Sequence, residues 1–144
     1  MGKLSPEIHF FFEKKVTLRD RVRLKEFVGR MFQQLEKPLG SLNFIFCSDP
    51  YLLRINREYL SHDYLTDIIT FDLSGGSGPV QGEVYISVDR VLDNAAQLGK
   101  TRKEELHRVI FHGVLHLCGF RDKTARDQKQ MRTMEDYFLE HYFR

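Results

Sequence analysis

The sequence predicts an α+β fold in which a small mixed sheet of four strands packs with about five helices. Three observations lead to this prediction. Short β-prone runs alternate in mixed order with longer segments that open on capping residues. Residues 105–118 are apolar on nearly every side, as expected for a central helix packed on the sheet. The 144 residues, 42% of them hydrophobic, suffice for one core, so residues 1–144 are expected to form a single domain.

The chain opens with a predicted strand and a predicted helix. Residues 7–13 form a short β-prone run rich in phenylalanine. The pattern Thr17-x-x-Asp20 has the spacing of a helix start, and the amphipathic segment behind it is expected to continue to about Leu35. The segment Lys37-Pro-Leu-Gly40 then ends the helix, because proline and glycine are typical of the residues beyond a helix end.

A second strand and a second helix follow. Residues 42–47 are mostly apolar and aromatic, which is typical of a buried strand. Asp49 is a favourable N-cap residue and Pro50 suits the first helical position. A helix is therefore expected to run from here to about Leu60.

The middle of the chain predicts a hairpin and then a helix. Residues 67–73 and 80–87 are the two strands. The glycine-rich residues 74–79 lack the Lys-Thr or Lys-Ser of a phosphate-binding loop and lead into a strand, so they are interpreted as the hairpin connection and no nucleotide cofactor is expected. Residues 88–98 predict a helix that Gly99 ends.

The last two helices both carry start signals. Thr101-x-x-Glu104 is a capping-box pattern for the apolar helix, and Thr124-x-x-Asp127 resembles one for the final helix. The only polar strip of the apolar helix consists of four residues, Glu105, Arg108, His112 and His116. The two histidines are therefore expected to reach water or a cleft.

His112 and His116 form a candidate metal site. Residues four apart lie one above the other on a helix, so both imidazoles can bind one ion. Gly119 can take the left-handed conformation that turns the chain back, which makes Asp122 a candidate third ligand. Two histidines and one carboxylate leave a coordination position open, as catalytic sites do. The alternative is an exposed strip of ion-paired residues.

Three stretches of the chain match a known family. Residues 112–119, His-Gly-Val-Leu-His-Leu-Cys-Gly, resemble an H-G-x-L-H-L-x-G signature. Residues 53–71 resemble a block L-x-x-N-x-x-Y-R followed by T-D-V-L-S-F, and residues 82–86 resemble a G-D-I-x-I strand. With matching length and order, the chain resembles the YbeY family, the metal-dependent endoribonucleases of bacterial ribosomal RNA maturation.

Two residues depart from the family pattern. The signature continues with G-x-D-H, whose final His is the third ligand, and an ungapped reading places Asp122 at that position. A one-residue insertion would place Lys123 there, but an ammonium group has no lone pair for a metal. Leu60 stands where the family usually has an arginine associated with activity.

The resemblance implies a metallohydrolase domain that holds one divalent ion. The ion is expected to be zinc, with nickel, iron or manganese as alternatives, bound by His112, His116 and Asp122. Metal-activated water is expected to cleave a phosphodiester of single-stranded RNA in 16S rRNA 3′-end maturation and ribosome quality control. Glu83, in the family-like strand, is the candidate auxiliary base and is assigned to the catalytic group with the two histidines. A solvent-facing or ion-paired strand residue is the alternative for Glu83.

Composition limits the partners. A net charge of +2 and a pI near 8.6 do not by themselves indicate a nucleic-acid-binding protein, so contacts with ribosomal RNA, the ribosome or ribosomal proteins must be local. Basic clusters at residues 19–25 and 123–132 are candidates for RNA contact or ordinary solvated faces. No apolar stretch of membrane-spanning length and no signal-peptide pattern occurs, so a cytoplasmic protein without a membrane partner is expected. Oligomeric state stays open.

Two other function classes stay open. The first is a ribosome-assembly or RNA-binding factor with a structural or weakly catalytic metal site, which the departures at Leu60 and Asp122 favour. The second is a metal-dependent hydrolase of another substrate, including a peptidase. The zinc-peptidase pattern H-E-x-x-H carries its general base directly after the first His, where this chain has Gly113.

Overall fold

The computed structural model of the protein describes residues 6–144. Within that range the chain forms four strands: β1 (Glu7–Phe12), β2 (Leu39–Cys47), β3 (Ile68–Asp72) and β4 (Val80–Ser87). It also forms five helices: α1 (Arg21–Gln34), α2 (Asp49–Leu60), α3 (Val88–Leu98), α4 (Arg102–Leu117) and α5 (Ala125–Tyr142). The strands make one sheet in the order β1-β2-β4-β3.

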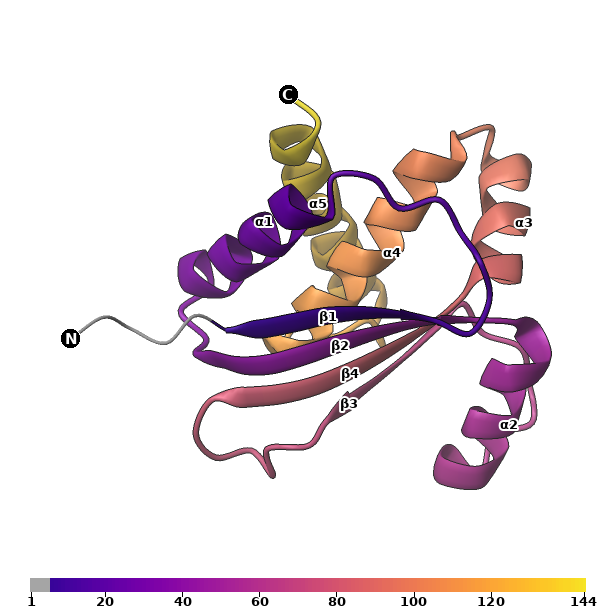
Figure 1. Cartoon of the computed structure of the whole chain (residues 1–144), viewed down its shortest axis with the longest axis horizontal. Helices are drawn as coiled ribbons and strands as arrows, with labels where there is room; N and C mark the ends of the chain where they lie inside the picture. The colour runs from indigo at the N-terminus through magenta and orange to yellow at the C-terminus, as the bar shows by residue number, and fades with distance from the viewer. Residues whose placement is uncertain (1–5) are drawn as a thin grey trace.

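The sheet is mixed. β1, β2 and β4 run parallel to one another, and β3 is antiparallel to β4 because a short hairpin joins the two. Helices α1, α4 and α5 lie over one face, and α2 lies beyond the other (Figure 1). The predicted α+β class, with a mixed four-stranded sheet and five helices, is confirmed.

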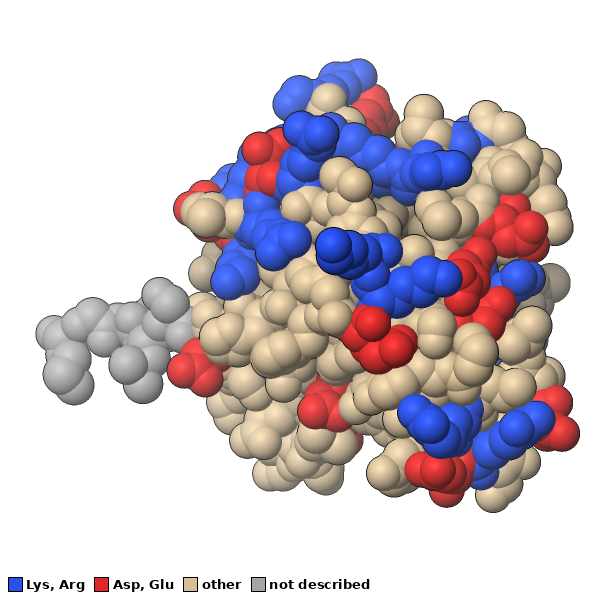
Figure 2. All heavy atoms as spheres, turned by 45° about the vertical axis from the view of Figure 1, so that its right-hand side comes forward, with Lys and Arg blue, Asp and Glu red and all other residues tan. Residues whose placement is uncertain are grey.

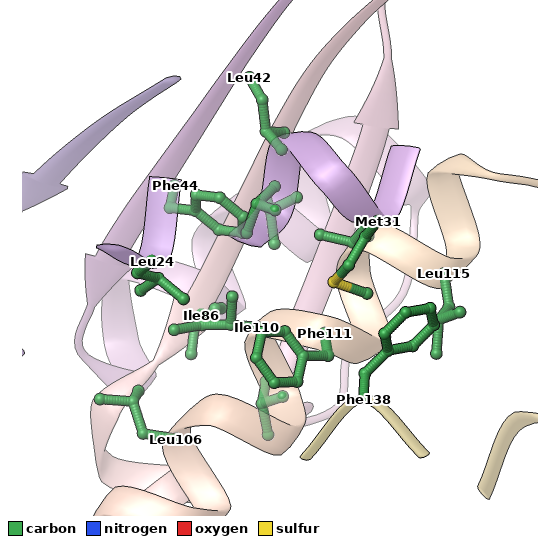
Figure 3. Close-up of a cluster of buried hydrophobic side chains, with 14 of the residues drawn as sticks. Leu24, Met31, Leu42, Phe44, Ile86, Leu106, Ile110, Phe111, Leu115 and Phe138 are labelled. Atoms are coloured by element: carbon green, nitrogen blue, oxygen red, sulfur yellow. The ribbon is translucent and has the colours of Figure 1, made fainter. Parts of the chain in front are cut away.

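Helix α4 is central, as predicted. It contacts α1, α3, α5, β3 and β4. Figure 3 shows Ile110 and Phe111 of α4 among side chains from the sheet and the neighbouring helices, including Phe44, Ile86 and Phe138. All five side chains are almost completely buried. Apolar side chains on nearly every side of α4 are buried and closely packed. The helix therefore has one fixed position, and so do the residues of its polar strip.

Gly113 lets α4 approach the sheet closely. A Cβ atom at this position would lie 2.9 Å from a methyl carbon of Val84 on β4 and 3.0 Å from one of Ile68 on β3. The first distance is shorter than real Cβ contacts, and the second is tighter than most of them. The missing side chain directly after the first histidine therefore serves packing, and it brings the histidine-bearing end of α4 against the β3 edge of the sheet.

The helix starts correct two details of the sequence prediction. The N-cap of α2 is Ser48, whose hydroxyl accepts from the Tyr51 backbone N–H, and Asp49 is the first helical residue. Helix α1 begins at Arg21 after Asp20 in left-handed conformation, without a side-chain cap, so the expected cap at Thr17 is not formed. The predicted N-cap lies one residue after the observed one for α2 and three residues before it for α1, because local signals place helix ends only to within a few residues.

The starts of α4 and α5 agree with the sequence prediction. The Thr101 hydroxyl accepts from the backbone N–H of Glu104, and Thr124 forms a complete capping box with Asp127. β2 begins at Leu39, inside the segment expected to end the first helix. Among residues 6–144, no helix has the length and apolar character needed to cross a membrane.

Candidate metal centre

The last two turns of α4 place His112 and His116 side by side. Their ring centroids are 4.5 Å apart, and both rings reach a cleft of about 230 Å³ between α4 and β3. The cleft is lined by Thr66, Asp67, Ile68, Thr70, Arg108, Val109, His112, His116 and Asp122. The two histidines of the polar strip thus reach a cleft, as the sequence predicted.

The chain turns back directly after α4. Gly119 has a φ of 100°, in the region that favours glycine, and the Phe120 backbone N–H donates to the Leu115 carbonyl oxygen at 3.0 Å. This turn brings Asp122 beside the histidines. Its Oδ2 atom lies 3.5 Å from Nε2 of His112 and 3.3 Å from Nε2 of His116.

The geometry of the three residues fits a small divalent ion. Their ligand atoms all lie within 4.8 Å of one another. Bonds of about 2.1 Å in a tetrahedral arrangement put ligand atoms about 3.4 Å apart, close to the two separations from the carboxylate. The Asp122 side chain is 45% exposed, so the group is open towards solvent on its side. We name this trio the His-His-Asp group.

Each imidazole is held by its other nitrogen. Nδ1 of His112 donates to Oε2 of Glu135 at 2.5 Å, and Nδ1 of His116 donates to the Phe120 carbonyl oxygen at 3.0 Å. With Nδ1 carrying the proton, Nε2 of each ring has a free lone pair that faces Asp122. Both rings are therefore oriented for metal binding by groups outside the His-His-Asp group.

Glu135 belongs to a buried ionic network. Arg108 donates to Oε1 of Glu135 at 2.9 Å and binds Glu105 through two hydrogen bonds of 2.9 and 2.6 Å. Glu105 is 1% exposed and Glu135 is 3% exposed. Burial works against ionisation of Glu135, but the hydrogen bond from His112 and the charge of Arg108 outweigh it and lower the pKa of this carboxyl. An ionised Glu135 beside His112 makes that imidazole a stronger metal ligand.

Asp67 adds a second carboxyl to the cleft. It stands just before β3 and lines the same wall as Thr66 and Thr70. Burial raises the pKa of Asp67, although the nearby His112 and Arg108 partly oppose the shift. The cleft thus offers a carboxyl that keeps its proton to higher pH than an exposed one.

Comparison with known proteins gives the family. A statistical description of the family named "Endoribonuclease YbeY" matches residues 11–143. The chain belongs to the YbeY family. Among curated YbeY-family proteins, the "Endoribonuclease YbeY" of Cytophaga hutchinsonii is 45% identical to this chain, over 94% of the chain and 96% of that protein. The one from Porphyromonas gingivalis is 43% identical, over 92% and 88%.

A solved structure supports the fold. The solution structure of TM1509 from Thermotoga maritima superposes with a TM-score of 0.61 at 26% identity. It covers 94% of this YbeY-family chain, and the chain covers 89% of it. The similarity therefore extends over most of the chain and is not confined to the histidine helix.

The structure does not bring Glu83 to the His-His-Asp group. Successive strand residues point to opposite faces of a sheet, and on β4 the neighbours Gly82 and Val84 face α4. Glu83 therefore lies on the opposite face, where its Oε1 accepts from the Tyr85 hydroxyl at 3.1 Å. The sequence-based interpretation of Glu83 as a base in the cleft is not supported, because strand alternation directs its side chain away from the His-His-Asp group.

Three further residues of the family-like segments and their surroundings fall outside the cleft lining. Leu60 is the last residue of α2, and Arg121 is exposed on the loop before Asp122. Asn56 is buried and donates to the Tyr64 carbonyl oxygen at 3.0 Å, so it holds the α2–β3 connection.

Glu135 is a residue of the site that the sequence analysis does not single out. One signal was present. Glu135 falls at helical spacing with Met131, Phe138 and Tyr142, which form the buried face of α5. A carboxylate on an apolar helix face needs a charged partner, and here the partners are His112 and Arg108.

Proposed function

We propose that this chain is a metal-dependent endoribonuclease that cleaves single-stranded RNA, with His112, His116 and Asp122 as the ligands of one divalent ion. The observation that carries the proposal is the convergence of two Nε2 atoms and one carboxylate oxygen in a cleft, while both Nδ1 atoms are already hydrogen bonded. The names of the family and of its curated relatives support the reaction class.

We assign zinc as the first candidate for the ion, with nickel, iron or manganese as alternatives. Two imidazoles and one carboxylate match the three protein ligands of catalytic zinc sites, which keep a further position open. The ion, when bound, would polarise a phosphoryl oxygen and lower the pKa of water. Replacing an imidazole by Asp122 reduces the positive charge of the centre. Which metal is bound then depends more on the availability of each metal in the cell.

The protein's own groups have separate tasks in this proposal. Glu135 and the Phe120 carbonyl hold the two imidazoles in the tautomer that leaves Nε2 free. The Asp67 carboxyl lines the same cleft, so it is the group positioned to exchange a proton with a reacting oxygen of the RNA chain. The cleft has the rigid helix α4 on one side and the loop of Asp122 on the other. RNA can therefore enter the cleft while the metal ligands keep their positions.

The proposed cellular role rests on the resemblance to the YbeY family. We place the activity in the maturation of the 16S rRNA 3′ end and in ribosome quality control, in the cytoplasm, with ribosomal RNA and the ribosome or ribosomal proteins as partners. Residues 1–144 act in this proposal as a single metallohydrolase domain. A ribosome-assembly factor with a weakly catalytic metal site is the second candidate, since Asp122 and Leu60 depart from the family pattern.

The test measures metal content and RNA cleavage on the same preparations. Wild type, His116→Ala, Asp122→Ala and Asp122→His are compared by mass spectrometry of bound metal and by cleavage of a single-stranded RNA. Glu58→Ala, an exposed position on α2, is the control. We expect about one ion per wild-type chain, loss of metal and cleavage in both alanine variants, and retention of metal in Asp122→His.

Two results would contradict the proposal. Absence of stoichiometric metal in the wild type would remove the proposed centre. Cleavage that is indifferent to His116→Ala and Asp122→Ala would separate the reaction from the His-His-Asp group, and retained RNA binding without cleavage would favour the assembly factor.

A further inference from the structure

A second cavity lies towards the opposite end of α4 from the His-His-Asp group. It has a volume of about 380 Å³ and is formed by the β1–α1 connection, α3 and the first turns of α4. It meets α4 at Arg102, Lys103, Leu106 and His107, whereas the two histidines of the His-His-Asp group lie about one to three turns further along the helix, at positions 112 and 116. The volume lies in the range of sites that bind small molecules.

Four cations and no acidic side chain line this cavity. They are Lys15, Arg19, Arg102 and Lys103. All four are exposed, and none forms an ion pair within the part of the chain that the structure describes. Figure 2 shows Lys and Arg side chains gathered over the upper part of the face it presents. Like charges around one opening repel one another, and an anion placed among them removes that repulsion.

The rest of the cavity lining is largely apolar. It consists of Val16, Val88, Val91, Leu92 and Leu106, with Thr17 beside them. The side chains of Val88, Val91 and Leu106 also belong to the core, so this wall is rigid. An apolar wall next to a cationic rim suits a ligand that has a flat apolar part and an anionic part.

His107 contributes a buried polar atom. The residue is 2% exposed and lines the cavity. Its Nδ1 donates to the Lys103 carbonyl oxygen at 2.7 Å, while Nε2 is buried and has no hydrogen-bond partner among the described residues. Burial lowers the pKa of His107, so the ring is neutral and Nε2 is an acceptor. A buried acceptor without a partner is rare in proteins, and it points to a donor from outside the described residues.

We propose that this cavity binds a nucleotide unit. The phosphate lies among the four cations, the base lies against the apolar wall, and an N–H or O–H of the base or ribose donates to Nε2 of His107. Inorganic phosphate at the rim would leave the apolar wall uncovered and Nε2 without a donor, so a nucleotide is favoured. The unit is either a free nucleoside monophosphate or one residue of an RNA strand.

Binding of adenosine 5′-monophosphate to the metal-free full chain tests the proposal by calorimetry, with inorganic phosphate as a second titrant. Wild type is expected to bind the nucleotide more tightly than phosphate. Lys103→Ala should weaken nucleotide binding about 5- to 10-fold, in line with the loss of one charge-assisted contact. Lys129→Ala, an exposed lysine on α5, is the matched control and should change nothing.

His107→Phe separates the base or ribose contact from the phosphate contact. Phenylalanine can keep the stacking on Tyr142, whose ring centroid lies 5.2 Å from that of His107, and it lacks the acceptor. We expect about 3- to 10-fold weaker nucleotide binding and unchanged phosphate binding. Asp122→Ala should bind the nucleotide as the wild type does, so this inference and the proposed metal centre can fail independently.

A short single-stranded RNA that competes with the nucleotide would identify an RNA residue as the ligand, and an RNA that does not compete would identify the free nucleotide. Three results would overturn the proposal: equal affinity for nucleotide and phosphate, equal losses in Lys103→Ala and Lys129→Ala, or full nucleotide affinity in His107→Phe.

Discussion

Glu135→Gln is the substitution that most directly tests how the metal ligands are held. The Glu135 carboxylate accepts one hydrogen bond from Nδ1 of His112 and another from Arg108. Glutamine has nearly the same volume, but its amide has only one oxygen, and its NH₂ group must then face one of these two donors. The substitution therefore removes the negative charge and one of the two hydrogen bonds without opening a cavity.

The expected loss has two parts. A hydrogen bond to a charged group contributes about 1.5–3 kcal/mol, but Arg108 keeps its two bonds to Glu105 and a buried carboxylate no longer needs to be desolvated. We therefore expect the free energy of unfolding of the metal-free protein to fall by about 1–2 kcal/mol. Removing the partner of a ligating histidine typically costs 10- to 100-fold in metal affinity, so zinc affinity should fall by about that factor.

The assay separates the two parts. Urea unfolding of the metal-free protein measures stability, and competition with a chromophoric chelator measures zinc affinity. Asp136→Asn, at the exposed next residue of α5, makes the same chemical change outside the cleft and is the control. Proton–nitrogen correlation spectra of the imidazoles should show the proton of His112 on Nδ1 in the wild type and a mixture of tautomers in Glu135→Gln.

One result would refute the reasoning. If Glu135→Gln loses stability but binds zinc within twofold of the wild type and keeps the His112 tautomer, Glu135 supports the fold and does not position the ligand. Loss of zinc affinity in Asp136→Asn to the same degree would point to a general effect of helix charge.

Three further outcomes are expected. Gly113→Ala should lower the free energy of unfolding by about 1–2 kcal/mol because the added methyl group meets the sheet. Gly29→Ala has open space in α1 and should raise the free energy of unfolding by about 0.5–1 kcal/mol. Urea unfolding of both variants checks this, and a Gly113→Ala variant as stable as the wild type would mean that α4 can shift. Burial raises the pKa of Cys118 to about 12, so iodoacetamide at pH 8 should label this thiol slowly in the folded protein and rapidly in concentrated urea. Equal labelling rates in the folded and the unfolded protein would contradict the burial of Cys118. Hydrogen bonds from Lys14 and from the backbone N–H of Asp49 lower the pKa of Asp89. The contribution of the Asp89 carboxylate to the stability of the fold is therefore present above about pH 4 and is lost as the pH falls through the pKa in the folded state. Asp89→Asn should destabilise the protein at pH 7 but not at pH 2, and a difference that does not depend on pH would count against the ion pair.

The sequence by itself determined the parts of the candidate centre that depend on neighbouring residues. The spacing of His112 and His116 puts both rings on one helix face, since an α-helix has 3.6 residues per turn. Gly119 marks the turn that brings Asp122 back, and the structure places the carboxylate 3.3–3.5 Å from both imidazoles. The mixed sheet and its five helices also followed from local strand, cap and turn signals.

Only the tertiary structure decided which distant side chains share the cleft. Glu135 lies 23 residues from His112 in sequence, and the packing of α5 on α4 brings the two into contact. Asp67 enters the cleft because β3 is the edge strand beside α4, whereas the alternation of side chains on β4 turns Glu83 to the other face. Local spacing is set by backbone geometry, but the face that a strand presents and the helix that covers it depend on the packing of the whole chain.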